Sequence, residues 1–344
     1  MTAVAELFHP DLNPTLRRLG ERPKGAGRAR PSEEDSQVRE TVWATLAELD
    51  GLRGPGLLDT AELMGPGLYQ SPFLDTVFAA ELLAADGRFG AELDRIATGE
   101  LTLAVAMREH GTDEPDQPAE LTVAEGRVTG VRRFVAFAAD VDHLLVVGGP
   151  EPVLALVPVR QPGVRTRRQD DLGRGDLYEV VLTGAQAQLL TSGGHYATAL
   201  ANARLRLAAH LAGIARGAVE LSTAHLKDRQ AFGAPLARQQ VLAHRLAALA
   251  ARTTAVLTFA RTADRAAGAG ADVRMPAAQA LFLAADLARE AAAEAVHLHG
   301  ARGLTEECDA SVFHRRAAVA ALTLGTPAGL RRLAATLLAN AHTV

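Results

Sequence analysis

Apolar residues in the second half of the chain recur at intervals of three and four positions. This spacing is that of one face of an α-helix, and it predicts a long helix over residues 199–227. The stripe consists of Leu200, Ala203, Leu207, Leu211, Ile214, Ala218 and Leu221. The same pattern predicts further helices over residues 239–267, 276–298, 310–322 and 327–341. Thr326 and Pro327 suit the N-cap and the first turn of the last helix.

The middle of the chain has short apolar or β-branched runs separated by glycine and proline. These runs predict strands over residues 101–107, 121–123, 127–129, 131–138, 144–147, 153–159 and 177–182. The turn Ala124-Glu125-Gly126 indicates a hairpin between the second and third runs. Residues 160–176 are polar and are expected to form a loop, and no strand is expected from Ala185 onward.

The N-terminal region has a helical pattern of shorter segments. Helices are predicted over residues 40–49, 57–64, 71–84 and 89–97, after a short amphipathic segment at 12–19 and a flexible linker at 21–36. The fold class that follows is α+β and multi-domain: an N-terminal helical domain (1–99), a middle antiparallel β-sheet or barrel domain (100–184) and a C-terminal four-helix-bundle-like domain (185–344).

Composition narrows the class of protein further. The 344 residues are 48% hydrophobic and 22% charged, which is typical of a globular chain. A net charge of −4 gives no electrostatic basis for binding nucleic acid. The single cysteine, Cys308, excludes an internal disulfide and favours a reducing, cytoplasmic location. We expect no signal peptide, no membrane span and no metal site, because no segment has the required pattern.

Two segments between predicted helices have side chains suited to binding a dinucleotide. The first is Arg229-Gln230-Ala231-Phe232-Gly233, followed by Gln240. An arginine at a helix end is ordinary in an interhelical loop, but its planar fork also pairs with a pyrophosphate. The second is His297-Leu298-His299-Gly300-Ala301-Arg302-Gly303. It is either a glycine-rich turn or a loop whose backbone amides approach phosphate oxygens.

In order and spacing, these segments resemble signatures of the acyl-CoA dehydrogenase family. The β region adds Gly126 to Ala136, which is similar to the family segment whose aromatic residue flanks the flavin ring. The resemblance implies FAD as cofactor, an acyl-CoA or carrier-bound acyl thioester as substrate, and a homo- or hetero-oligomer with another subunit of this family. The cofactor-binding residues that it implies are Arg229, Phe232, Gln240, Phe134, His297, Gly300 and Gly303.

The glutamate that removes the α-proton in this family has no counterpart in the chain. The common position of that glutamate falls on Leu324 and the alternative position on Ala203, so the catalytic residue is unknown. Three functions remain open. The first is FAD-dependent α,β-desaturation of an acyl thioester, an oxidoreductase reaction of lipid metabolism, with an altered or partner-supplied base. The second is a non-catalytic subunit that completes a partner's FAD site. The third is a flavin-dependent oxygenase on the same fold.

Overall fold

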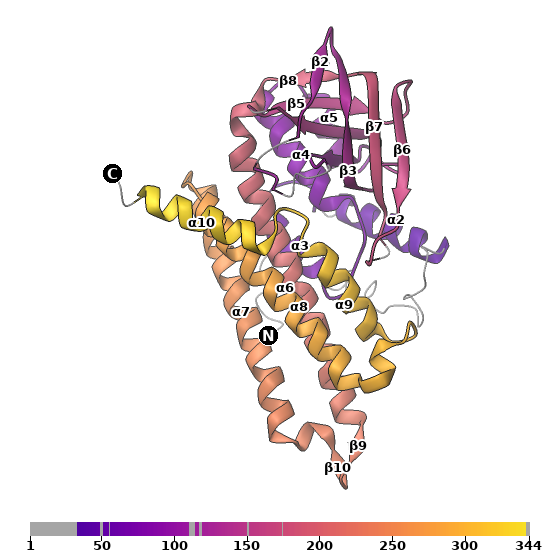
Figure 1. Cartoon of the computed structure of the whole chain (residues 1–344), viewed down its shortest axis with the longest axis vertical. Helices are drawn as coiled ribbons and strands as arrows, with labels where there is room; N and C mark the ends of the chain where they lie inside the picture. Colours follow the sequence, from indigo (N-terminus) through magenta and orange to yellow (C-terminus); the bar gives the residue numbers. More distant parts are fainter. Residues whose placement is uncertain are drawn as a thin grey trace.

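The computed structural model describes residues 33–48, 51–54, 56–109, 114–116, 119–149, 151–173 and 175–341. The amphipathic segment predicted at 12–19 and most of the predicted linker lie outside these residues. Figure 1 shows the two sheets at one end of the long axis, and the long C-terminal helices extending to the other end. The prediction of an α+β chain with a C-terminal helical region is confirmed.

Helices form the N-terminal part of the described chain. Val42 and Leu46 of the first helix pack against Phe73 and Val77 of the third, and all four side chains are buried. The first helix begins at Glu33, earlier than the predicted start at residue 40, so it includes the end of the predicted linker. The four helices are α2 (Glu33–Glu48), α3 (Leu57–Met64), α4 (Phe73–Asp86) and α5 (Gly90–Ala97).

Two four-stranded sheets form the middle of the molecule, with orders β1-β4-β5-β8 and β2-β3-β7-β6. A buried cluster that includes Val128, Val146, Val157 and Val180 joins residues from both sheets, so the sheets pack face to face. Within the described strands, neither sheet closes into a barrel. The strands are β1 (Leu103–Ala106), β2 (Thr122–Ala124), β3 (Arg127–Ala136), β4 (His143–Gly148), β5 (Val153–Pro158), β6 (Val164–Gln169), β7 (Leu177–Gln186) and β8 (Gln188–Leu190).

The hairpin predicted from Ala124-Glu125-Gly126 is confirmed by the pairing of β2 with β3. Ala124 pairs with Arg127, which leaves Glu125 and Gly126 as a two-residue turn with φ of 51° and 71°. Positive φ at both turn positions matches the twist of the flanking strands.

Four predictions about the β region are wrong. In each case the pairing with a neighbouring strand, and not the local sequence, determines the structure. The runs predicted at 127–129 and 131–138 form one strand, β3, whose register with β7 shifts twice. The predicted polar loop contains β6, an edge strand on which Arg167 pairs with Glu179 of β7 at 2.9 Å. Past residue 184, where no strand was predicted, β8 pairs with β5. The pair β1–β4 is parallel, not antiparallel.

The five long or medium C-terminal helices predicted from periodicity are confirmed, with ends shifted by a few residues. Leu207, Leu211 and Ile214 of the predicted stripe are buried. Thr326 caps the last helix, since its hydroxyl accepts a hydrogen bond from the Gly329 amide at 3.0 Å. The helices are α6 (Tyr196–Asp228), α7 (Gln240–Gly268), α8 (Arg274–His299), α9 (Asp309–Ala320) and α10 (Pro327–Ala341).

Short elements connect the long helices. A short β-hairpin separates α6 from α7. Each of its strands has two residues, and Phe232 and Gly233 form the turn between them. The short elements are η2 (Ser192–His195), β9 (Gln230–Ala231), β10 (Ala234–Pro235), η3 (Leu236–Arg238) and η4 (Gly300–Leu304). The division into three domains stays a prediction, and the strands run past its boundary at residue 184.

Helices α3 and α6 approach each other backbone to backbone. A Cβ atom on Gly213 would lie 2.2 Å from the carbonyl oxygen of Glu62, and one on Gly65 would lie 2.4 Å from that of His210. Neither position therefore accepts a larger side chain without a shift of the helices. This contact fixes the face of α6 that lines the cavity described below.

Candidate functional site

A cavity of about 180 Å³ lies where the β sheets, α3, α4, α6 and the loop before α10 meet. Most of its lining is apolar, as expected of a site for a small organic ligand. Its apolar residues include Leu68, Phe78, Leu207 and Ile214. Ala136 and Phe137, at the end of β3, close it on the side of the sheets.

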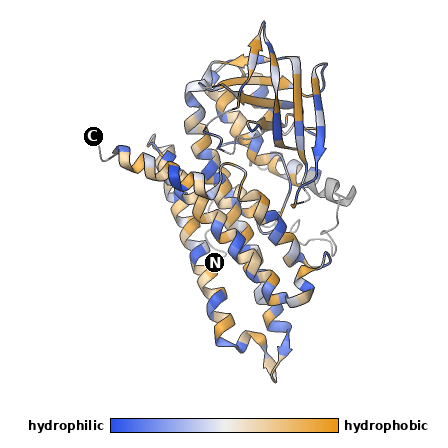
Figure 2. Cartoon of the chain, in the orientation of Figure 1, coloured by the Kyte–Doolittle hydropathy of each residue, from blue (hydrophilic) through white to orange (hydrophobic). Residues whose placement is uncertain are grey.

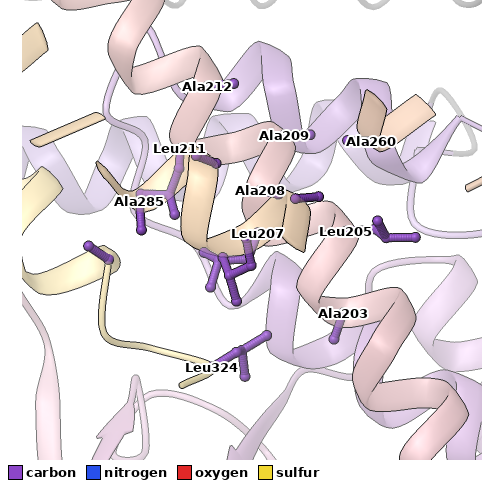
Figure 3. Close-up of a cluster of buried hydrophobic side chains, with 14 of the residues drawn as sticks. Ala203, Leu205, Leu207, Ala208, Ala209, Leu211, Ala212, Ala260, Ala285 and Leu324 are labelled. Atoms are coloured by element: carbon purple, nitrogen blue, oxygen red, sulfur yellow. The ribbon is translucent and has the colours of Figure 1, made fainter. Parts of the chain in front are cut away.

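Both positions where the sequence lacks a glutamate line this one cavity. Ala203 comes from α6 and Leu324 from the loop between α9 and α10, and their exposed fractions are 4% and 6%. Figure 3 shows the Leu324 side chain beside the turn of α6 that carries Ala203 and Leu207. A carboxylate at either position would face this cavity. The chain instead has the methyl group of Ala203 and the isobutyl group of Leu324 at these positions.

Arg204 holds the Leu324 loop against α6. Its Nε donates to the Leu324 carbonyl oxygen at 3.0 Å, and its Nη1 donates to Asp116 Oδ1 at 3.0 Å. The Arg204 side chain is buried, with an exposed fraction of 2%. A buried guanidinium needs such partners, so this network fixes the loop without any catalytic group in it.

Asp75 is one of three aspartates that line the cavity, with Asp171 and Asp176, and the sequence analysis singled out none of them. Asp75 lies in the first turn of α4, and its Oδ2 accepts a hydrogen bond from the Val105 amide at 3.0 Å. Burial raises the pKa of the Asp75 carboxyl to about 6, and the hydrogen bond from Val105 opposes this shift. Asp75 is therefore mostly ionised at neutral pH and titrates close to it.

His210 is a further titratable group of the cavity that the sequence analysis missed. Its Nδ1 lies 3.2 Å from the Ala61 carbonyl oxygen, so Nδ1 carries the proton and Nε2 is an acceptor. Burial lowers the pKa of the imidazole to about 4, which keeps it neutral at neutral pH. A signal was present in the sequence, because His210 follows Leu207 by three positions and precedes Ile214 by four.

A second group of residues gathers at the far end of the bundle, where α6 and α8 both end. The His225 and His299 rings stack with centroids 4.1 Å apart. Burial lowers the pKa of His225, and the charges of His299, Arg229 and Arg302 lower it further. The charge of Asp228 opposes this shift. We call His225, His299, Arg229 and Arg302 the cationic cluster, in which the two arginines carry the fixed positive charge that an anionic ligand would meet.

Several residues predicted to bind a cofactor surround the cationic cluster. Phe232 at the hairpin tip is 91% exposed and has a φ of 55°. Gln240 begins α7 and is exposed, as is His297 near the end of α8. An aromatic ring so exposed is unusual on a free surface and is typical of a contact with a ligand or a partner.

The two predicted glycines have different structural roles. Gly300 has a φ of 60° and open space around the position of a Cβ atom, so its backbone is accessible. Gly303 is buried, and a Cβ there would lie 2.4 Å from the Val296 carbonyl oxygen. The tight packing of η4 against α8 thus explains Gly303 without any ligand.

Phe134 lies apart from the other predicted site residues. It is on β3, 52% exposed, with a φ of 55°, and its amide donates to Gln169 Oε1 at 3.0 Å. Figure 1 shows β3 and the β9–β10 hairpin at opposite ends of the long axis. The hairpin and the adjoining helix ends carry hydrophilic residues, whereas apolar residues dominate along the helices (Figure 2). Within one chain, the predicted site residues therefore lie in two separate places, Phe134 on the β sheets and the others at the end of the helical bundle.

Comparison with known proteins shows which proteins share this sequence and fold. Residues 193–338 match the family model described as "Acyl-CoA dehydrogenase, C-terminal domain". Acyl-CoA dehydrogenase IpdE2 of Mycolicibacterium smegmatis is 27% identical over 296 residues, which cover 83% of this chain and 80% of that protein. The chain is thus similar to acyl-CoA dehydrogenases over most of its length, and residues 193–338 match their C-terminal domain.

Solved structures of acyl-CoA dehydrogenases share the whole fold. The Tcur3481–Tcur3483 steroid acyl-CoA dehydrogenase variant superposes with a TM-score of 0.85 at 24% identity, covering 97% of this chain and 98% of that one. A chain of the ChsE4–ChsE5 complex from Mycobacterium tuberculosis gives a TM-score of 0.77 at 21% identity, with 98% of each chain covered. At these identities the similarity establishes the fold and not the substrate.

Acyl-CoA dehydrogenases are FAD-binding flavoproteins, and the residues at the bundle end fit such a group. The cationic cluster suits a pyrophosphate, and the exposed Phe232 ring suits an adenine or flavin edge. Among the described residues, no group of three or more His, Cys, Asp or Glu side chains is arranged to hold a metal ion. None of the described helices combines the length and the apolarity that crossing a bilayer requires.

Proposed function

We propose that this chain is a subunit of an FAD-dependent acyl-CoA dehydrogenase-type oxidoreductase that desaturates an acyl thioester. In this assembly a partner chain of the same family supplies the carboxylate base, and the cationic cluster of this chain completes the partner's FAD site. One observation carries the proposal: Ala203 and Leu324 line the same cavity, and neither side chain accepts a proton.

The reaction of the family explains why this observation matters. A carboxylate takes the proton from the α-carbon of the acyl thioester, the β-hydrogen leaves as a hydride that FAD accepts, and a double bond forms between the two carbons. The base works best in an apolar pocket, where burial raises its pKa toward neutrality. The cavity of this chain provides the pocket but has no carboxylate at either family position.

The separation of the site residues supports a shared cofactor. Arg229 and Phe232 adjoin the β9–β10 hairpin at one end of the long axis, whereas β3, whose last residue Ala136 lines the cavity, belongs to the sheets at the other end (Figure 1). A cofactor held by both groups therefore has to lie between two chains. The ChsE4–ChsE5 complex, whose fold this chain shares, is named for two different chains, which is consistent with a heteromer.

The absorbance spectrum of the purified chain tests the proposal, alone and after co-expression with a second acyl-CoA dehydrogenase-type chain. We expect little flavin in the chain alone, a flavin spectrum in the assembly, and bleaching of that flavin by acyl-CoA without oxygen. A yellow chain that bleaches with acyl-CoA in the absence of any partner would overturn the partner-supplied base. Oxygen-dependent NAD(P)H consumption with a flavin reductase would instead select an oxygenase.

The second candidate is an independent dehydrogenase that uses Asp75 as a displaced base. The position of Asp75 in the cavity and its pKa of about 6 favour this candidate. It requires the homomer to bleach with acyl-CoA and requires Asp75→Asn to abolish the bleaching. Under the first proposal, Asp75→Asn leaves the rate of bleaching by the partner's site unchanged.

A further inference from the structure

We infer that His225 and His299 are a proton-coupled part of the FAD site: this stacked pair takes up a proton when the pyrophosphate of FAD binds at the cationic cluster. The inference rests on the proposed function, since it concerns the same cluster. It adds a second source of positive charge to the fixed charges of Arg229 and Arg302, and it makes the affinity for FAD depend on pH.

The two histidines come from different helices and meet at the end of the bundle. His225 lies in the last turn of α6, and His299 is the last residue of α8. Their rings stack with centroids 4.1 Å apart and an interplanar angle of 25°. Nδ1 of His299 lies 2.7 Å from the Ala295 carbonyl oxygen and therefore carries a proton. Nε2 of His299 is then the position at which this ring gains a positive charge.

The charges around His225 oppose its protonation as long as no anion is bound. Burial lowers the pKa of His225, and the charges of His299, Arg229 and Arg302 lower it further. Asp228 is the acidic group whose charge acts on His225, and its opposite effect is the smallest of the five. At neutral pH His225 is therefore mostly neutral in the free protein, and the fixed positive charge of the cluster is that of the two arginines.

The ends of two helices increase the positive charge that an anion needs at this place. The last carbonyl groups of α6 and α8 carry partial negative charge, which repels a phosphate and favours a protonated histidine in the last turn. A pyrophosphate diester is a dianion, so its charge raises the pKa of a nearby imidazole and a proton enters the pair. Protonation of both rings is disfavoured, because two positive charges would then lie at the stacking distance.

The surroundings of the pair are open to a ligand. Arg229 and Arg302 are exposed, and His225 and His299 are half-buried. Gly300, which follows His299 directly, has a φ of 60° and no atom within 4 Å of the position of a Cβ atom. A phosphate can therefore approach the backbone next to the His299 ring.

Proton-coupled binding differs measurably from binding by the arginines alone. A guanidinium stays charged throughout the neutral range, so its contribution to affinity does not change with pH. A histidine whose pKa is higher in the complex than in the free protein takes up a proton on binding, so affinity rises as the pH falls. Both phosphates of FAD are diesters that do not titrate near neutral pH, so this proton does not come from a change in the ligand.

Calorimetric titration of FAD into the flavin-free assembly tests the inference at constant ionic strength. Buffers with different ionisation enthalpies report the protons that are taken up. We expect net proton uptake near neutral pH and an affinity about tenfold higher at about pH 6 than at about pH 8, as one hydrogen bond to a charged group allows. The double variant His225→Phe with His299→Phe keeps two stacked rings that do not titrate, and it should show neither the uptake nor the pH dependence.

A control variant and the alternative outcomes separate this inference from the proposed function. His195→Phe replaces an exposed histidine at the other end of α6 and should keep both the uptake and the pH dependence. FAD binding without proton uptake, or equal uptake in the double variant and the wild type, overturns the role of the pair and leaves the FAD site intact. Absence of FAD binding at every pH overturns the FAD site itself. Circular dichroism identifies a variant that does not fold, and His225→Gln with His299→Gln then serves as the milder substitution.

Discussion

Arg204 on α6 donates a hydrogen bond to the backbone carbonyl of Leu324, 120 residues further along the chain, at 3.0 Å. Ala203, its neighbour on the helix, lines the cavity together with Leu324. One arginine thus connects the two positions that the resemblance to acyl-CoA dehydrogenases assigns to the base. Neither position carries a carboxylate in this chain.

The ion pair between Arg204 and Asp116 should stabilise the chain measurably. Asp116→Asn leaves a guanidinium that is 2% exposed without its charged partner. We expect the free energy of unfolding to fall by about 2 kcal/mol, less than for a fully buried pair because Asp116 is 36% exposed. Urea denaturation measures the change. The exposed control Asp94→Asn should alter it by less than about 0.5 kcal/mol, and an equal effect of both variants would contradict the role of Arg204.

Restoring a carboxylate at the common family position should restore proton abstraction. Leu324→Glu places the carboxyl in the cavity, where burial raises its pKa, and costs about 1–3 kcal/mol of stability. In the assembly with bound FAD, we expect additional flavin bleaching by octanoyl-CoA without oxygen, measured by absorbance. The matched control is Leu322→Glu, because Leu322 is 44% exposed and should give no gain. No gain from Leu324→Glu, with FAD and acyl-CoA still bound, would show that the cavity does not hold the reacting carbons beside Leu324.

Loss of the arginine in the cationic cluster should weaken FAD binding. Arg229→Ala removes a charge-assisted contact to a pyrophosphate, so we expect FAD to bind about 10- to 100-fold more weakly in the assembly. The flavin-to-protein absorbance ratio after dialysis reports this change. Arg289→Ala, which removes the same charge from an exposed position of α8, should retain its flavin. Full flavin content in Arg229→Ala would exclude the assigned contact.

Asp75 and His210, which both line the cavity, should have opposite effects on stability as the pH falls. His210 has an ordinary pKa of 6.5 and a folded pKa of about 4, so the unfolded chain binds this proton first and stability is lost between these values. Asp75 has an ordinary pKa of 3.8 and a folded pKa of about 6, so the folded chain binds this proton first and stability is gained. Each effect amounts to about 3 kcal/mol.

Variants at these positions separate the two effects. Between about pH 6.5 and about pH 4, Asp75→Asn should lose about 3 kcal/mol more stability than the wild type, because only the loss from His210 remains. His210→Gln should gain about 3 kcal/mol of stability relative to the wild type over the same range, since the gain from Asp75 then acts alone. Urea denaturation at both ends of the range measures the differences. Identical pH dependence in all three proteins would contradict the burial of these groups.

The local pattern of the sequence was sufficient for the helices and for most strands. The period of the apolar stripe around Leu207 and Ile214 predicts α6, because a helix face repeats every three or four residues whatever it packs against. The polar strand β6 and the short β8 were missed. Their stability comes from pairing with β7 and β5, and a strand with polar side chains gives no periodic signal.

The cavity and its chemistry depended on contacts between distant segments. The sequence indicated that Ala203 and Leu324 cannot act as a base, and it predicted a dinucleotide contact for Arg229 and Phe232. It did not indicate that Asp75 and His210 face the same cavity, because burial and hydrogen bonding depend on residues far away in the chain. The sequence also did not indicate that Phe134 lies far from Arg229 and Phe232 within one chain.

The sequence by itself determined the resemblance to acyl-CoA dehydrogenases, the helices and the absence of a glutamate at positions 203 and 324, since residue identity and short-range periodicity carry this information. The tertiary structure alone decided which side chains share a space: the packing of α6 against α3, α4 and the Leu324 loop forms the cavity, and the length of the bundle separates it from the cationic cluster. Distances between segments far apart in the chain arise from packing, and packing has no local signature.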